Sequence, residues 1–156
     1  MDSEHCMDSI RCTIQGVYVA LSDTGASPAV ILGLEGDRCL PIYIGLWEAI
    51  SINNALNREI APRPLTHDLF MEFCTRFGIE IRQLYIDTLE DGVYYAHLHL
   101  ACADQEETLD CRPSDGIALA LRCAAQILLS PAVAEGSSMR RNDLPNLVDL
   151  NTYFQS

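Results

Sequence analysis

The sequence contains no lysine, and all ten of its basic side chains are arginines. Schiff-base chemistry and a P-loop both need a lysine amine, so its absence excludes both. The arginines stand against 22 acidic residues, which gives a formal net charge of −12. Charge of this sign repels nucleic acid, over a Debye length of about 8 Å at physiological salt. A polyanionic substrate would therefore need a local arginine cluster or bound divalent cations.

Long apolar runs and paired cysteine motifs are also missing. No stretch approaches the ~20 apolar residues of a membrane span, and the acidic start, MDSEHCMDSI, lacks the hydrophobic region of a signal peptide. We therefore expect a cytoplasmic protein without a membrane association. The seven cysteines form no Cys-x-x-Cys pair. We interpret them as reduced, mostly buried side chains rather than as a disulfide framework or a zinc site.

The rest of the composition is typical of one soluble globular domain. The chain has 156 residues, of which 49% are hydrophobic and 21% are charged, and a domain of this length buries roughly two thirds of its surface. Apolar alternation predicts two strand meanders, and 3.6-residue periodicity predicts about three main helices. Strands are expected at 10–21, 28–34, 38–44, 79–88, 93–102, 107–111 and 125–129, and helices at 46–59, 66–78 and from 113 onward. This order predicts an α+β fold with a mixed, largely antiparallel sheet or partial barrel.

Three segments are predicted along the chain: an N-terminal extension over 1–9, the domain over 10–135 and a C-terminal tail over 136–156. The stretch PAVAEG is interpreted as the last turn, and after it Gly, Ser, Asn and Pro become frequent without any periodicity. The final LNTYFQS is similar to part of a protease recognition site from an expression vector. We therefore assign no function to the tail.

The helix predicted over 66–78 has signals at both of its ends. Thr66 is a suitable N-cap, and Gly78 is a suitable residue just after the helix. One apolar stripe follows the helical spacing, formed by Leu69, Phe70, Phe73, Cys74 and Phe77.

The stretch CRPSDGIALALR, residues 111–122, places polar residues directly before an apolar helix. One interpretation is structural: Pro113 ends the preceding strand, Ser114 accepts a hydrogen bond from a free helix amide, and Asp115 suits the positive helix end. A similar arrangement occurs in RPLTHDL, residues 63–69, where Arg-Pro again precedes a hydroxyl and an aspartate.

The repeated arrangement suggests phosphate binding. Each arginine, Arg63 or Arg112, lies next to a helix N-terminus, where free amides and the dipole attract anions and a guanidinium adds a bidentate clamp. Thr66 and Ser114 would contribute hydroxyls. The alternative is that the two arginines pair with aspartates inside the protein; the aspartates concerned are Asp68, Asp110 and Asp115.

His67 and the same three aspartates could supply further chemistry. In the first helical turn the dipole keeps His67 neutral, so it could act as a general base or a metal ligand, although a capping or surface histidine is the alternative. Asp68, Asp110 and Asp115 could hold Mg²⁺ or Mn²⁺, which activates water and neutralises phosphate.

His97 and His99 share one face of a strand, where a His-x-His pair could bind zinc. The sequence offers no third ligand for such a site. A solvated sheet face or an interface is the alternative.

Three segments together resemble the bifunctional nuclease domain family over about residues 10–135: LPIYIGLWEAISI (40–52), RPLTHDL (63–69) and DCRPSDGIALALR (110–122). The resemblance implies an α+β fold with a strongly bent sheet, frequent dimers and nuclease activity on DNA and RNA. Gly116 departs from the family pattern, which usually has alanine there. The matching polar residues are Glu48, Arg63, Thr66, His67, Asp68, Asp110, Arg112, Ser114, Asp115 and Arg122.

With this resemblance, we expect a homodimeric nuclease that hydrolyses phosphodiester bonds with Mg²⁺ or Mn²⁺. We assign catalysis to His67, Asp68 and Asp115, phosphate binding to Arg63, Thr66, Arg112 and Ser114, and the metal to Asp68, Asp110 and Asp115. One alternative is a non-catalytic dimeric module that binds a phosphate-bearing ligand or a protein partner. Another is that the motifs only fix the helices to the sheet.

Overall fold

The computed structural model describes residues 8–155, in which nine strands form one open sheet. The first meander is β1 (Ile10–Ser22), β2 (Gly25–Gly33) and β3 (Arg38–Tyr43), and the second is β4 (Glu80–Glu90), β5 (Val93–Cys102) and β6 (Gln105–Cys111). Between them lies β7 (Gln126–Leu129), antiparallel to β1 and parallel to β4. The prediction of a mixed, largely antiparallel sheet from two meanders is confirmed. Residues 1–7 of the predicted N-terminal extension lie outside the described residues.

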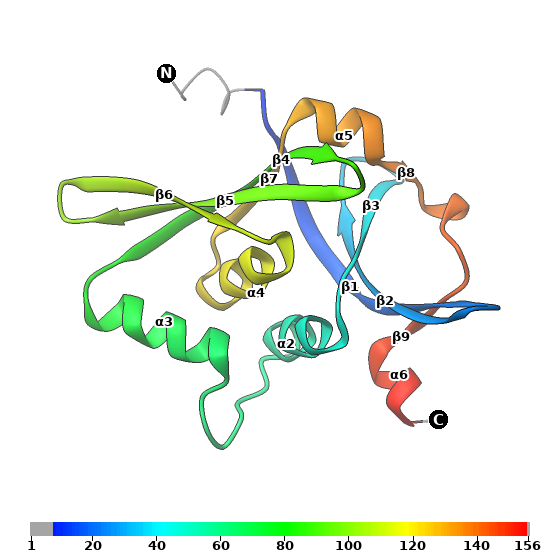
Figure 1. Ribbon diagram of the computed structural model, residues 1–156, viewed down its shortest axis with the longest axis horizontal. Helices are drawn as coiled ribbons and strands as arrows, with labels where there is room; N and C mark the ends of the chain where they lie inside the picture. The colour runs from blue at the N-terminus through cyan, green and yellow to red at the C-terminus, as the bar shows by residue number, and fades with distance from the viewer. Residues whose placement is uncertain (1–7, 156) are drawn as a thin grey trace.

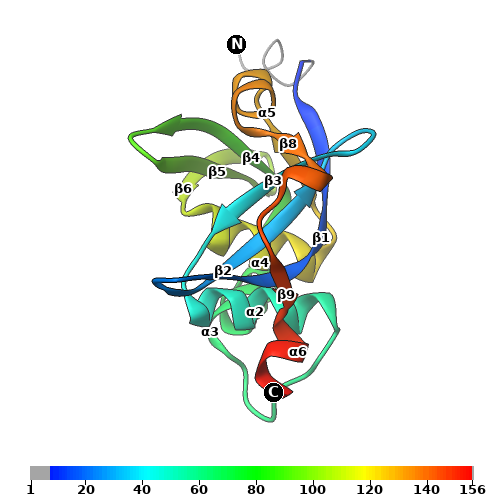
Figure 2. The same cartoon turned by 90° about the vertical axis from the view of Figure 1, so that its right-hand side faces the viewer.

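The bend of the sheet lies in β1, which belongs to both halves. Its first residues, 10–12, pair with β7, whereas the remainder pairs with β2. A register shift between Ile14 and Gly16 marks the change. A β-bulge of this kind increases the local twist of a strand. Consequently the two meanders point in different directions around the helices (Figures 1 and 2).

The helices α2 (Leu46–Leu56), α3 (Thr66–Arg76) and α4 (Pro113–Cys123) pack together, with α4 in contact with both of the others. Helix α4 lies in the angle of the bent sheet and packs on β4, β5 and β7, while α2 packs on β1 and β2. The apolar run of α4 is almost fully buried, as its sequence predicts. This central position fixes where the start of α4 lies.

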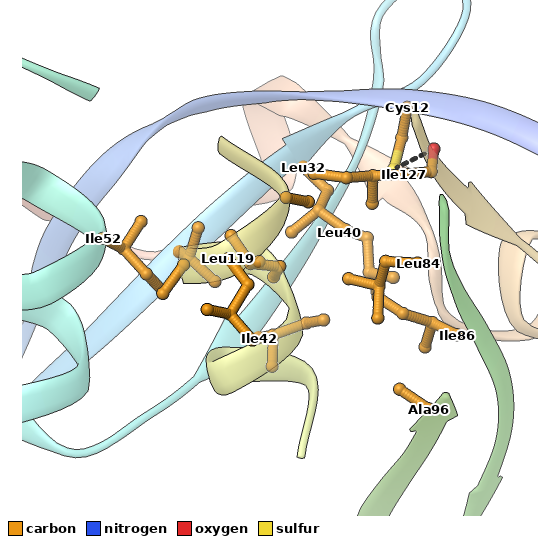
Figure 3. Packing of buried hydrophobic residues seen from close by; sticks show 14 of the residues in the cluster. Cys12, Leu32, Leu40, Ile42, Ile52, Leu84, Ile86, Ala96, Leu119 and Ile127 are labelled. Atoms are coloured by element: carbon orange, nitrogen blue, oxygen red, sulfur yellow. Dashed lines mark hydrogen bonds between the residues drawn. The ribbon is translucent and has the colours of Figure 1, made fainter. Parts of the chain in front are cut away.

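The core joins the helices to both meanders (Figure 3). Leu119 of α4 lies near Ile52 of α2 and Ile42 of β3, and Leu84 and Ile86 of β4 complete the far side. Each of these side chains is at most 5% exposed. Burial of one such aliphatic side chain stabilises a fold by about 1.5–3 kcal/mol. The helix starts are therefore held on a rigid framework.

Helix α3 differs from its predicted form in two respects. Its N-cap is Leu65 rather than Thr66, and Asp68 Oδ2 accepts the hydrogen bond from the Leu65 amide at 3.0 Å. Its apolar stripe is only partly covered: Cys74 is buried and Phe70 half-buried, but three members remain exposed, namely Leu69, Phe73 and Phe77. The predicted glycine after the helix is confirmed, because Gly78 has φ of +69° and Ile79 N donates to Cys74 O.

The C-terminal segment has more regular structure than its sequence suggests. PAVAEG forms helix α5 (Pro131–Ser137), which begins because Ser130 Oγ accepts a hydrogen bond from Val133 N and Pro131 occupies the first turn. After it come β8 (Met139–Arg140), the 3₁₀ turn η1 (Arg141–Asp143), β9 (Leu147–Asp149) and α6 (Leu150–Gln155). β8 pairs with β3, and β9 pairs with β1. The interpretation of 131–136 as a turn is wrong, and the tail continues the sheet.

The described cysteines are all free thiols. Three are buried (Cys12, Cys39 and Cys74), whereas Cys102 is exposed. Burial raises the pKa of the Cys12 thiol to about 12, so this thiol stays protonated. Within residues 8–155, no helix has the length and hydrophobicity needed to cross a bilayer.

Candidate functional site

The start of α4 presents an arginine to solvent. Arg112 is the N-cap with extended backbone, Pro113 follows in the first turn, and no side chain caps the helix. The Arg112 side chain turns back onto its own helix, where Nε donates to Asp115 Oδ2 at 2.9 Å and Nη2 donates to Oδ1 at 3.2 Å. The side chain of Arg112 is nevertheless 64% exposed. One face of the guanidinium is fixed by Asp115, and the other remains accessible.

The start of α2 supplies the second partner of Arg112. Nη1 of Arg112 donates to Glu48 Oε1 at 3.2 Å. The Glu48 carboxylate folds back against Gly45, the N-cap of α2, and occupies the space that a Cβ at position 45 would need. Glycine at this position therefore allows Glu48 to reach Arg112. The starts of α2 and α4 meet at this ion pair.

An open pocket of about 520 Å³ lies beside the pair. Glu48, Arg112 and Ser114 line one side of it. The other walls come from the start of β2, the end of β3 and the start of β5, and include Pro28, Ile42, Tyr43, Ile44, Val93 and Tyr94. The pocket is thus lined by charged groups at the helix starts and by tyrosines from β3 and β5.

Behind Arg112, a histidine connects α4 to α3 and α2. His67 Nε2 lies 2.9 Å from Asp115 Oδ1, and His67 Nδ1 lies 2.6 Å from Ser51 Oγ. Since a carboxylate only accepts, Nε2 carries the proton, and the Ser51 hydroxyl donates to Nδ1.

A second arginine closes the same network from the far end of α4. Arg122 Nε donates to Asp68 Oδ1 at 2.8 Å, Nη1 donates to Ala118 O at 2.9 Å, and Nη2 donates to Ser51 Oγ at 3.2 Å. Its side chain is only 11% exposed. Hydrogen bonds therefore run without interruption from Glu48 through Arg112, Asp115, His67, Ser51 and Arg122 to Asp68.

The two aspartates of this network are held ionised. The hydrogen bond from Arg122 is the main cause that lowers the pKa of Asp68. Burial alone would raise the pKa of Asp115, but hydrogen bonds from Arg112 and His67 outweigh it and the pKa is lowered. Each carboxylate thus carries a negative charge that an arginine already neutralises.

The structure brings together only part of the predicted site. The two helix starts do meet, because His67 of α3 contacts Asp115 of α4. Arg63 and Thr66 are exposed and do not line the pocket. Arg63 forms no ion pair with any residue in the described range, 8–155. Asp110 lies on β6 opposite His97. The arginine that serves the start of α3 is Arg122.

The predicted metal ligands do not converge. Among residues 8–155, no three His, Cys, Asp or Glu side chains are placed to hold a metal ion. Both oxygens of Asp68 and of Asp115 accept hydrogen bonds from the protein. This donor set does not fit a preformed magnesium or manganese site, which needs six oxygen ligands including waters.

His97 and His99 lie on the outer face of the second meander. Their rings stack at 5.0 Å, and His97 Nδ1 lies 4.0 Å from Asp87 Oδ2. They belong to no three-ligand group within the described part of the chain. The sheet-face interpretation fits this arrangement.

Three residues of the network had no role in the sequence interpretation. Glu48 and Arg122 belong to the matching polar set, whereas Ser51 gives no signal, because a serine within an amphipathic helix is ordinary. Arg122 could have been found from its position, since an arginine at the end of the apolar run IALAL is rarely buried unless it is paired.

A model of the bifunctional nuclease domain matches residues 30–142 of the chain. The chain belongs to the bifunctional nuclease domain family. An uncharacterized protein of Mycobacterium tuberculosis is 39% identical over 99 residues, which cover 64% of this chain and 58% of that protein. The bifunctional nuclease 1 of Oryza sativa subsp. japonica is 30% identical over 138 residues, or 85% of this chain and 42% of the rice protein. The bifunctional nuclease 1 of Arabidopsis thaliana is 27% identical over 125 residues, which cover 77% of this chain and 38% of the Arabidopsis protein.

The chain therefore spans about half the length of the curated relatives it matches. The part that matches the bifunctional nuclease domain includes the complete network from Glu48 to Arg122. It also includes every wall of the pocket except the start of β2. The site thus lies within the family domain, whereas all of β1, β9 and α6 lie outside the match.

Proposed function

We propose that this chain is a nuclease that hydrolyses phosphodiester bonds of DNA and RNA in the pocket between the starts of α2 and α4. The observation that carries the proposal is the exposed Arg112 beside the Glu48 carboxylate, at the mouth of an open pocket. Membership of the bifunctional nuclease domain family supports it, as do the names of the plant relatives.

Arg112 and Ser114 are the proposed phosphate ligands. A guanidinium has five N–H donors, and Arg112 uses three of them on Asp115 and Glu48. One N–H on each terminal nitrogen has no partner among residues 8–155. These two donors can bind phosphate oxygens, with support from the free amides in the first turn of α4.

Glu48 is the carboxylate best placed to accept a proton from the attacking water. It lines the pocket, and its side chain is 22% exposed, so it remains accessible. Water attacks phosphorus, its proton passes to the carboxylate, and the P–O bond to the leaving oxygen breaks. Arg112 would stabilise the negative charge that develops on the phosphate.

The assigned catalytic residues His67, Asp68 and Asp115 act from behind this pair. Asp115 orients Arg112, and His67 holds Asp115. Asp68 acts through Arg122, which positions α3 against α4. The assignment of Arg63 and Thr66 to phosphate binding remains a prediction.

The requirement for Mg²⁺ or Mn²⁺ remains a prediction to which we assign no step. Because Asp68 and Asp115 are paired and Asp110 lies on another element, a metal would have to bind together with the substrate phosphate. Cleavage assays with each ion and with EDTA test this directly. Full activity in EDTA would remove the metal from the proposal.

The decisive experiment compares two exposed arginines. Arg112→Ala should reduce cleavage of single-stranded DNA and RNA by about 10²-fold or more, because a donor to the developing charge is lost. Arg76→Ala is the matched control, since Arg76 is also exposed and also paired with a carboxylate, Glu72. The control should retain activity. Equal activity in both variants, or no cleavage by the highly purified wild type, would overturn the proposal.

A non-catalytic module that binds a phosphate-bearing ligand is the second candidate. The net charge of −12 and the unconverged carboxylates favour it. In this case a nucleoside monophosphate should raise the melting temperature of the wild type without turnover. The shift should disappear in Arg112→Ala and persist in Arg76→Ala.

We also propose that the chain forms a homodimer, as the family resemblance implies. The exposed apolar row on α3, Leu69, Phe73 and Phe77, is 53–66% exposed and is a surface that a second copy could cover. Light scattering should give twice the mass of the chain for the wild type and the mass of one chain for Phe73→Glu. The cytoplasmic location remains a prediction.

A further inference from the structure

The lining of the pocket at Arg112 is of two chemical kinds. Arg112, Ser114 and the start of α2 are polar, and there helix amides and a guanidinium favour an anion. Tyr43 and Tyr94 also line the pocket, together with Pro28 and Val93. A ligand that fills the whole pocket therefore combines a negative group with a flat, largely apolar group.

Ser114 supplies a second polar group for a ligand in this pocket. Only 6% of the residue is exposed, yet it lines the pocket. Its hydroxyl has no hydrogen-bond partner within residues 8–155, and it does not cap α4. No fully buried side-chain oxygen of the described residues lacks a partner, so the Ser114 hydroxyl is accessible from the pocket, where a ligand can complete its hydrogen bonding.

The size of the pocket and the charge of the chain limit the ligand further. A volume of about 520 Å³ lies in the range of small-molecule sites, which is roughly 300–1,000 Å³. A long polyanion would meet repulsion elsewhere, because the net charge is −12. Recognition is therefore local and involves one phosphate group with its attached base.

We infer that the pocket binds one unstacked nucleotide of a single strand, with its phosphate at Arg112 and Ser114 and its base against Tyr43 and Tyr94. The inference rests on the proposed function and specifies the substrate of the same site. A base within a duplex is paired and stacked, so it cannot enter a pocket without being extruded. Single strands, loops and frayed ends are therefore the substrates, and intact duplex is not.

Binding measurements test this inference separately from cleavage. The probe is a fluorescein-labelled strand of ten thymidines with phosphorothioate linkages, which resist hydrolysis, and the comparison is the same strand annealed to its complement. We expect at least tenfold tighter binding of the single strand. A plot of the logarithm of the association constant against the logarithm of salt concentration should have a slope near −1. Each neutralised phosphate of a single strand contributes about −0.7 to this slope, and the pocket binds one phosphate. A slope steeper than about −4 would indicate a long backbone track and overturn the inference.

Neighbouring tyrosines provide the matched variants. Tyr94→Ala and Tyr43→Ala should each weaken binding of the single strand about tenfold, because a stacking surface is lost. Tyr95→Ala is the control, since Tyr95 is exposed but does not line the pocket. Equal binding of single strand and duplex, or unchanged binding in both pocket variants, overturns the inference. If single strands bind through the tyrosines but are never cleaved, the proposed function fails while the ligand stands. If single strands and duplex are cleaved alike and the tyrosine variants bind unchanged, the inferred ligand is wrong while the proposed function stands.

Discussion

Two arginines at opposite ends of α4 make similar ion pairs in different surroundings. Arg112 pairs with Asp115 and Glu48, and its side chain is 64% exposed on an open pocket. Arg122 pairs with Asp68 and also bonds Ser51 and Ala118, with 11% of its side chain exposed. The exposed pair is screened by water and contributes little to stability, whereas the covered pair holds three helices together. Arg112 is thus free to serve a ligand, and Arg122 serves the fold.

The largest expected effect comes from breaking the covered pair. Arg122→Met should lower the free energy of unfolding by about 2–4 kcal/mol, because Asp68 loses its partner while it remains partly buried. Urea denaturation of the variant and the wild type measures this difference. Arg112→Met, its counterpart in the exposed pair, should change the same quantity by less than about 1 kcal/mol. If the two variants lose equal stability, the assignment of separate roles is wrong.

The hydroxyl between the two arginine pairs gives the next largest effect. Ser51 accepts from Arg122 and donates to His67, so Ser51→Ala leaves a buried donor and a buried acceptor without their partner. The expected loss is about 1–3 kcal/mol of unfolding free energy. Ser27→Ala, an exposed serine on the pocket wall, should be neutral in the same denaturation experiment. A neutral Ser51→Ala would mean that water replaces the hydroxyl.

The stability of the variants at acidic pH should distinguish the two ion pairs, with a smaller effect than the substitutions above. The pKa values of Asp68 and Asp115 are lower in the folded protein than their ordinary values, so the unfolded chain binds protons first as the pH falls. The stabilisation is complete above the unfolded pKa and is lost as the pH falls through the folded pKa, which places the window below about pH 4. Melting temperatures between pH 2 and pH 7 should fall more steeply in this window for the wild type than for Arg122→Met. Parallel curves would exclude Asp68 as a source of the acid sensitivity.

The same comparison explains what the sequence could predict. Strands followed from apolar alternation and the end of α3 from Gly78, because these signals are local and act within a few residues. The shared motif raised the question whether the two helix starts meet, and the contact between His67 and Asp115 answers it. The motif, however, suggested that Arg63 plays the role that Arg122 has. Helix packing brings Arg122 to Asp68 across 54 positions of sequence, and no local pattern encodes such a contact.

The other differences between the predicted and the observed helices and strands also have local or long-range causes. Helix α5 had a readable signal, since Ser130 and Pro131 are a suitable N-cap and first-turn pair, and the interpretation as a turn gave it too little weight. The strands β8 and β9 had none, because each is two or three residues long and is defined by its pairing with β3 or β1. Thr66 is the first helical residue instead of the N-cap, and Asp68 accepts from the amide of the actual N-cap, Leu65.

The smallest expected effect on stability comes from Gly45, and it tests the exposed pair most specifically. The backbone at Gly45 has φ of −73° and ψ of 162°, which alanine adopts without strain, so Gly45→Ala should change the unfolding free energy by less than about 1 kcal/mol. The new Cβ, however, would occupy the place of the Glu48 carboxylate and move it away from Arg112. If Glu48 accepts the proton from water, cleavage should fall at least tenfold although the protein remains folded.

The control for this variant is Gly136→Ala, whose added Cβ meets no neighbouring atom within 4 Å and which should retain activity. Gly36→Ala is a poor control because Gly36 has φ of +67°, which strains any other residue. Activity retained in Gly45→Ala would show that the position of Glu48 is unimportant and would exclude Glu48 as the proton acceptor.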